Sequence, residues 1–309
     1  MAVYTTYDQI GKAESVEDII YDISPTDTPF LSSVKNEKVS ARSFEWIEDA
    51  LAAAAANAEI EGFQAVDETL TTPTVRNNKC QILSKTINIS GTADAIKTYG
   101  RAKETAYQLG KALKEIKRDY ERAMVGVSNA AVDTNASTAR EMASIDQMIS
   151  TNIDANAATG GGGSGTGGTD GTTATVLVES DILDLGQLCY ENGSEPSMLM
   201  IKPADATRVA AFAQASGRNR EIQQTKTLVN AIDLLVTPFG EYRVVINRHQ
   251  SAAHAFLLDP SMFKTCTLRP FTRTLLAKNG DNDRHLIVGE VSVKHNNFGA
   301  SGMVKDLTA

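Results

Sequence analysis

Residues 98–127 read TYGRAKETAYQLGKALKEIKRDYERAMVGV, and this stretch has the strongest periodic pattern in the chain. Its apolar residues recur three or four positions apart, a spacing that places them on one face of a helix. The spacing predicts one continuous helix, roughly 40 Å long at the usual rise per residue. Because no second segment has this pattern, the sequence favours a helix packed on a sheet over a coiled coil. The apolar positions are Ala102, Ala106, Leu109, Leu113, Ile116, Tyr120, Ala123 and Val127.

The segment before this helix, residues 39–90, has the pattern of extended chain around a polar tip. Arg42–Ile47 and Gln81–Ile89 alternate between apolar and polar residues, as half-buried strands do. Between them lie an alanine run, Ala52–Ala56, and an acidic, threonine-rich stretch that ends at Pro73. The sequence therefore predicts a long two-stranded excursion with a loose tip.

The first 40 residues are polar and broken into short pieces. Ser15 and Asp18 form an N-cap pair for a short helix that continues to Ile23. The helix ends before Pro25, because the residue that precedes a proline is displaced from the helical region. A segment of this kind buries little surface by itself, so we expect an arm that lies on another surface.

After the long helix comes a glycine-rich stretch, residues 159–172, in which eight of fourteen residues are glycine. This composition is typical of a flexible linker or surface loop. The rest of the chain mixes helices with strands that are distant in sequence, which indicates an α+β fold. We expect helices at Ser180–Tyr190 and after Pro203, and strands at Met198–Ile201, Ile232–Val236, Tyr242–Ile246, Ala255–Leu258, Cys266–Leu276 and Leu286–Lys294.

The composition excludes several classes of protein. The net charge of −8 argues against a protein whose main affinity is for nucleic-acid phosphates or anionic lipid. No uncharged apolar run approaches the roughly 20 residues that a membrane span needs. Three cysteines far apart in sequence imply no disulfide framework. We expect a soluble protein from a reducing compartment.

Motifs for catalysis or cofactor binding are weak or missing. GxGxxG occurs twice in the glycine-rich stretch, but no strand pattern precedes it, so we interpret it as a plain loop. The four histidines have no metal-ligand spacing, and Cys189 lies on the apolar side of a helix, where it is expected to be a core residue. The sequence thus predicts no catalytic residue, no cofactor and no metal, and disfavours an enzyme.

Two segments carry opposite charge. Seven acidic residues and no Lys or Arg lie between Glu45 and Glu68, whereas Lys97–Arg122 has eight basic residues against four acidic ones. The simple interpretation is two solvated faces. The alternative hypothesis is that the acidic excursion of one subunit lies over the basic helix of a neighbour, with complementary potentials setting the register. The candidates are Glu45, Glu48, Asp49, Glu59, Glu61, Asp67 and Glu68 against Lys103, Lys111, Lys114, Lys117, Arg118 and Arg122.

The order of arm, excursion, long helix, α+β part and returning strands resembles tailed-phage major capsid proteins of the Hong Kong 97-type fold. Seven short motifs in the same order are similar to patterns of the SU-ten-type major head protein family. The resemblance covers nearly the whole chain, from about Tyr7 to Lys305. The motifs are Ser24–Phe30, Phe44–Trp46, Ser90–Ala93, Tyr99–Arg101, Lys117–Glu121, Leu268–Pro270 and Gly280–Asp281.

This resemblance implies an α+β chain with an N-terminal arm, an extended β-hairpin loop, a peripheral domain with a long spine helix, and an axial domain. The glycine-rich stretch departs from the family pattern and is expected to be a variable loop near the domain junction. The implied divisions are 1–37 for the arm, 38–90 for the extended loop, 91–174 and 265–309 for the peripheral domain with its spine helix at 98–127, and 175–264 for the axial domain.

The resemblance also implies the function of a major capsid protein. Hexamers and pentamers would assemble in the host bacterial cytoplasm into the icosahedral head of the virion, enclosing double-stranded DNA without sequence-specific binding and without a membrane. Because fewer than 40 residues precede the excursion, a separate scaffold protein is expected. A portal and a decoration protein are further expected partners.

Three alternatives stay open at this point. An encapsulin-type bacterial nanocompartment would use the same fold to hold cargo enzymes. A soluble hydrolase would lose turnover when His254 or His285 is replaced. A tail or decoration protein would form rings, tubes or trimers instead of closed shells.

Overall fold

A computed structural model of the chain describes residues 27–52, 54–64, 67, 70–96, 103–133, 138–154, 174–215 and 234–308. The chain divides into two compact units. Among the described residues, unit 1 holds Ser84–Ile116 and Arg273–Ile287, and unit 2 holds Asp27–Leu83, Lys117–Thr272 and the residues from Val288 onward. The predicted helix Ser15–Ile23 and the glycine-rich stretch 159–172 lie outside the described residues, and the predicted domain limits stay predictions.

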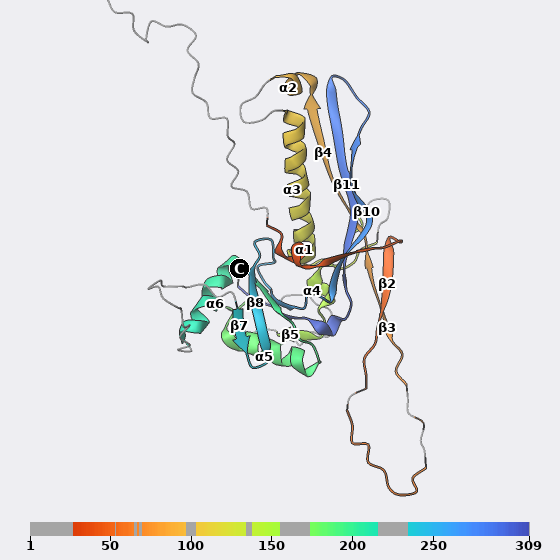
Figure 1. Cartoon of the computed structure of the whole chain (residues 1–309), viewed down its shortest axis with the longest axis vertical. Helices are drawn as coiled ribbons and strands as arrows, with labels where there is room; N and C mark the ends of the chain where they lie inside the picture. The colour runs from red at the N-terminus through yellow and green to blue at the C-terminus, as the bar shows by residue number, and fades with distance from the viewer. Residues whose placement is uncertain are drawn as a thin grey trace, which may run out of the picture. The chain divides into compact units, whose positions relative to one another are not determined.

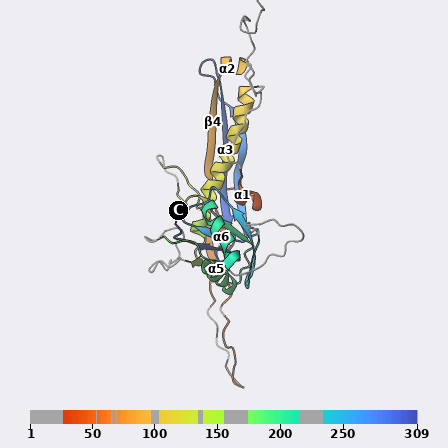
Figure 2. The ribbon, with the colours of Figure 1, turned by 90° about the vertical axis from the view of Figure 1, so that its left-hand side faces the viewer.

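The first sheet has four strands in the order β1-β10-β11-β4, so the two long strands in its centre come from the end of the chain. β1 runs parallel to β10 with Lys35 opposite Lys264. In unit 1, the first half of α3 runs beside β4 and β11 (Figure 1, Figure 2). The bounds are β1 Lys35–Lys38, β4 Gln81–Ser90, β10 Phe263–Leu275, β11 Asn282–His295 and α3 Glu104–Val125.

The second sheet has six strands in the order β5-β12-β9-β6-β8-β7 and belongs to unit 2. β12, close to the C-terminus, lies between the edge strand β5 and β9, so it is an inner strand of the sheet. The bounds are β5 Asn152–Asp154, β6 Met198–Ile201, β7 Leu234–Thr237, β8 Gly240–Ile246, β9 Ala255–Leu258 and β12 Gly302–Val304.

The two faces of this sheet bury separate cores, because successive strand residues point to opposite sides. On β6, Met200 joins a core with Tyr120 and Met124 of α3, whereas the neighbouring Leu199 joins a core with Leu185. Among the described residues, five helical segments besides α3 belong to unit 2. They are α1 Pro29–Ser33, α4 Ile145–Met148, α5 Glu179–Glu191, α6 Pro203–Ala215 and the short 3-10 helix η2 Phe298–Ala300.

The third sheet is a hairpin of β2 (Ser43–Glu48) and β3 (Thr74–Lys79), paired antiparallel from Ser43 opposite Lys79 to Glu48 opposite Thr74. Between the strands, the described residues of 49–73 form an open loop without helix or strand (Figure 1). The predicted excursion is therefore present, but its second strand was wrongly assigned. Gln81–Ile89 does form a strand, β4, which pairs with β11 instead of β2.

The long helix α3 is present, with one change in its buried face. Ala112, Ile116, Tyr120 and Met124 are buried at a spacing of four residues. Leu113, which the sequence placed in the apolar stripe, is 52% exposed, and Ala106 is exposed as well. The predicted stripe is wrong at these two positions, because only the second half of the helix lies against a large core.

Candidate assembly surfaces

Aromatic rings and an ion pair hold the base of the hairpin to the rest of unit 2. Trp46 stacks on Phe44 with ring centroids 5.8 Å apart and meets Phe298 edge-on at 6.3 Å. Arg76 of β3 lies 4.4 Å from the centroid of Phe298 and its Nε donates to Glu48 at 2.6 Å. Glu48 also accepts a hydrogen bond from the Phe298 amide at 3.1 Å. Glu48, one of the intersubunit candidates, therefore has partners within its own chain, and its role between subunits stays a prediction.

Asn78 anchors the second strand of the hairpin. This side chain is fully buried, and its Nδ2 donates to the carbonyl of Val293 at 2.6 Å. Its Oδ1 accepts from the amides of Ala143 at 2.9 Å and Lys79 at 2.7 Å. A single side chain thus joins β3 to β11 and to the loop before α4.

The tip of the hairpin has little support from its own chain. Leu51, Ile60 and Leu70 are 99%, 79% and 87% exposed. A turn forms where the Phe63 amide donates to the Ile60 carbonyl at 3.1 Å, with Gly62 at φ +84°. The candidates Glu45, Asp49, Glu59, Glu61 and Asp67 are exposed and have no ion pair among the described residues, and Glu68 lies outside those residues.

The basic candidates, Lys103 just before α3 and the others on it, also form no ion pair within the described parts of the chain. Lys103, Lys111, Lys114, Lys117 and Arg122 are exposed, and Arg118 is partly buried. By contrast, Glu115 on the same helix forms an ion pair of 3.4 Å with Lys85. Apart from Glu48, the described candidates on the two charged surfaces therefore form no ion pair among the described residues.

Glu121 holds the first turn of α1 to α3. This fully buried carboxylate accepts hydrogen bonds from the backbone amides of Phe30 at 2.9 Å and Leu31 at 2.8 Å, and from Nδ2 of Asn247 at 2.7 Å. The two amides belong to the first turn of α1, where backbone N–H groups lack helical partners. Burial raises the pKa of Glu121, while these three donors oppose that effect.

Replacing Glu121 by leucine is expected to lower the free energy of unfolding by about 2–4 kcal/mol, because buried donors lose their acceptor. The measurement is urea unfolding of the unassembled subunit. Lys117→Leu, an exposed change on the same helix, is the control and should stay within about 0.5 kcal/mol of the original chain. An unfolding curve for Glu121→Leu that matches the original would contradict this role.

A neutral histidine lies within a stack of aromatic rings that connects α1 to the hairpin base. His295 is fully buried, lies parallel to Phe263 at 4.0 Å and stacks on Phe298 at 5.8 Å. Phe263 in turn contacts Phe30 edge-on at 5.4 Å. Burial lowers the pKa of His295 from 6.5 to about 3, so this ring is uncharged at neutral pH.

Stability is therefore expected to depend on pH through His295. Below pH 6.5 the unfolded chain binds a proton that the folded chain rejects until about pH 3, so this contribution to stability falls as the pH decreases. Between pH 6.5 and 5 the loss is about 2 kcal/mol. Asp154 has the opposite effect on stability. Burial raises its pKa to about 6, so as the pH decreases the folded chain protonates Asp154 before the unfolded chain does, and this contribution to stability rises.

The comparison of His295→Phe with the original chain isolates the histidine, because both chains keep Asp154. The variant retains a planar ring in the stack, and its loss of stability between pH 6.5 and 5 should be smaller by about 2 kcal/mol. Equal pH dependence of urea unfolding in the two chains would show that His295 is not the group responsible.

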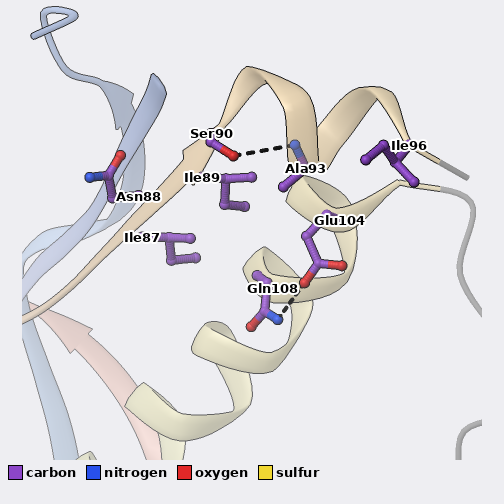
Figure 3. A pocket seen from close by; sticks show the side chains of 8 residues that line it. All are labelled: Ile87, Asn88, Ile89, Ser90, Ala93, Ile96, Glu104 and Gln108. Carbon is purple, nitrogen blue, oxygen red and sulfur yellow. Dashed lines mark hydrogen bonds between the residues drawn. The ribbon is translucent and has the colours of Figure 1, made fainter. Parts of the chain in front are cut away.

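Unit 1 has a shallow groove of about 610 Å³ where β4, α2 (Gly91–Ala95) and the start of α3 meet (Figure 3). Ile87, Ile89 and Ile96 line it, together with Glu104 and Gln108, whose side chains are joined by a hydrogen bond of 2.7 Å. Two of the sequence motifs meet beside this groove. The amide of Gly91 donates to the carbonyl of Asp281 at 3.2 Å, and a Cβ at Gly91 would lie 2.6 Å from the Asp281 carboxylate.

The described residues contain no cluster of His, Cys, Asp and Glu that could hold a metal ion. His254 and His285, the two histidines of the hydrolase alternative, are both buried and belong to different units. The three cysteines are buried and free, and burial raises the pKa values of Cys80 and Cys189 to about 11 and that of Cys266 to about 12. No helix in the described ranges is long and apolar enough to cross a membrane.

Comparison with solved structures identifies the fold. The capsid of a native GTA particle aligns with a TM-score of 0.66 at 13% identity and covers 98% of each chain. The holo-SrpI encapsulin complex from Synechococcus elongatus aligns with a TM-score of 0.57 at 8% identity, over 99% of this chain and 96% of that one. The fold is therefore of the Hong Kong 97 type, and the fold alone does not separate phage capsids from encapsulins.

Sequence comparison makes that distinction. The SU10 major capsid protein family matches residues 3–308. The major capsid protein of Escherichia phage Phieco32 is 31% identical over 339 aligned positions, which cover 98% of this chain and 96% of the relative. The chain belongs to the SU10 major capsid protein family, and it is the major capsid protein of a tailed phage. The resemblance seen in the sequence is confirmed, and the phage interpretation is favoured over the encapsulin and hydrolase alternatives.

Proposed function

We propose that this capsid protein forms its shell by placing the acidic hairpin of one subunit over the basic side of α3 in a neighbouring subunit. The observation that carries the proposal is the exposed hairpin tip, where acidic and large apolar side chains lack support from their own chain. Leu51 is 99% exposed and Leu70 is 87% exposed, which is unusual for side chains of this size.

Electrostatics supports α3 as the complementary surface. Apart from Glu48, which pairs with Arg76, the described acidic residues of the hairpin and the basic residues of α3 have no ion pair among the described residues, so both are available to a second copy. Complementary potentials mainly set orientation and encounter rate, whereas burial of apolar side chains contributes most of the affinity. We therefore propose that the charges align the two subunits. Burial of the exposed apolar side chains would supply most of the affinity, and these are Leu51, Ile60, Phe63 and Leu70.

The assembly that follows consists of hexamers and pentamers in a closed icosahedral head around double-stranded DNA, located in the virion after assembly in the host cytoplasm. A separate scaffold protein, a portal and a decoration protein are the expected partners, and no catalytic role is proposed. The net charge of −8 supports a wall that does not bind the packaged DNA tightly.

Negative-stain electron microscopy with light scattering of the purified protein tests the form of the assembly. Closed shells of uniform diameter, or separate hexamers and pentamers that close when a scaffold is added, would support the proposal. A small oligomer that never closes, or open rings and tubes, would contradict it.

A further inference from the structure

The chain contains two asparagine–glycine pairs, Asn192–Gly193 in unit 2 and Asn279–Gly280 in unit 1. This pair is prone to spontaneous loss of the side-chain amide, because glycine has no Cβ to keep its backbone nitrogen away from the asparagine carbonyl carbon. The nitrogen must lose its proton and reach Cγ of the asparagine. A pair whose groups are held by hydrogen bonds therefore reacts slowly, and the two pairs of this chain differ in that respect.

The first pair is held in the C-terminal cap of α5. The Gly193 amide donates to the carbonyl of Tyr190 at 3.0 Å, and Gly193 has φ +77°, as the residue after a helix often does. The Asn192 side chain is held as well, because its Nδ2 donates to Oδ1 of Asn152 and, at 3.0 Å, to the carbonyl of Leu188. The attacking nitrogen and the leaving group are both engaged at this pair.

The second pair is open by comparison. Asn279 and Gly280 lie in the loop between β10 and β11, and both are exposed. Within the part of the chain that the structure describes, neither the Asn279 side chain nor the Gly280 amide forms a hydrogen bond. Gly280 has φ +107°, a conformation that favours glycine, and its carbonyl accepts from the amide of Asn282 at 3.0 Å. The turn therefore favours the glycine but does not engage its nitrogen.

We propose that Asn279 is a site of spontaneous deamidation in the folded subunit and that Asn192 is protected. The backbone nitrogen of Gly280 gives up its proton and attacks Cγ of Asn279. The Cγ–Nδ2 bond breaks, and Nδ2 leaves as ammonia with that proton, which closes a five-membered succinimide ring. Water then opens the ring at Cγ to give aspartate, or at the main-chain carbonyl carbon to give isoaspartate.

Either product adds one negative charge to this loop. The loop already contains the exposed Asp281, while Asp283 is paired with Lys278 at 2.8 Å. The isoaspartate form also lengthens the main chain by one carbon, in a loop whose ends are joined where the Leu276 amide donates to the Arg284 carbonyl at 2.8 Å. The subunit thus becomes more acidic with time at a single position, and this change does not depend on shell assembly.

Incubation of the purified, unassembled subunit at mildly basic pH tests the proposal. Pepsin digestion at acidic pH stops the reaction, and mass spectrometry of the peptides measures conversion at each pair. The Asn279 peptide should convert about tenfold faster than the Asn192 peptide or more, because three hydrogen bonds must break before Asn192 reacts. Isoelectric focusing of the intact chain should show one acidic step, which Asn279→Gln should remove because glutamine forms the corresponding ring far more slowly.

The same incubation in guanidinium chloride is the matched control. Unfolding removes the hydrogen bonds of both pairs, so the two peptides should then convert at similar rates. The folded chain should differ from this control mainly at Asn192, whose conversion slows on folding, whereas Asn279 should convert in both states.

Three results would overturn the proposal. The first is equal conversion of Asn279 and Asn192 in the folded chain, and the second is an Asn279 peptide that converts only after unfolding. The third is a difference between the peptides that persists in guanidinium chloride, which would assign it to the neighbouring residues and not to the fold.

Discussion

Replacing Glu59, Glu61, Asp67 and Glu68 by lysine is expected to abolish shell assembly while the subunit stays folded. Each exposed ion pair contributes at most about 1 kcal/mol, but the change turns four attractions into repulsions. A loss of about 4 kcal/mol for each hairpin contact corresponds to roughly three powers of ten in the dissociation constant. Light scattering and electron microscopy measure assembly, and urea unfolding checks the fold.

The matched control changes the same amount of charge elsewhere in unit 2. Asp184, Glu191, Glu195 and Glu241 are exposed acidic residues outside the hairpin, and their replacement by lysine should leave assembly largely intact. Normal shells from the hairpin variant would contradict the pairing. Equal failure of both variants would show that net charge, and not the hairpin, controls assembly.

Replacing Asn78 by leucine is expected to lower the free energy of unfolding by about 3–5 kcal/mol, since each buried polar group left without a partner costs about 1–3 kcal/mol. The groups affected are the carbonyl of Val293 and the amides of Ala143 and Lys79. Urea unfolding of the unassembled subunit measures the change. The outcome tests whether the hairpin base is rigidly attached to the core.

Asn77→Leu is the control for this change. Asn77 is the neighbouring residue on β3 and is exposed, so its replacement should change stability by less than about 0.5 kcal/mol. Similar unfolding curves for both variants would mean that the hydrogen bonds of Asn78 contribute little to stability.

Several elements could be predicted from sequence because their apolar pattern is local. The strands at 198–201 and 255–258 have the observed limits, since each is a run of residues buried on both faces. β3 was missed because TVRNNK has no apolar alternation, and its single buried residue is the polar Asn78. The partner of β4 was missed because it comes from β11, almost 200 residues later, and pairing over that separation leaves no local signal.

The candidate surfaces were predictable in charge but not in detail. Glu48 lies on the same face of β2 as Phe44 and Trp46, because side chains two positions apart in a strand point to the same side. That alternation was a usable signal for an inward Glu48, whereas Glu45 and Ile47 point outward. Glu121 gave a similar signal, as an acidic residue next to the apolar Tyr120, but its partners Phe30 and Leu31 are 90 residues away and only the fold reveals them.

The most direct test of the hairpin pairing is a double charge reversal, measured as shell yield by light scattering and electron microscopy. One variant carries lysine at Glu59, Glu61, Asp67 and Glu68, and another carries glutamate at Lys103, Lys111, Lys114 and Lys117. A third chain carries both sets. We predict that each single set blocks assembly and that the combined chain recovers closed shells, because its hairpin and helix are again complementary. Shells from either single set, or a folded combined chain that stays unassembled, would contradict the pairing.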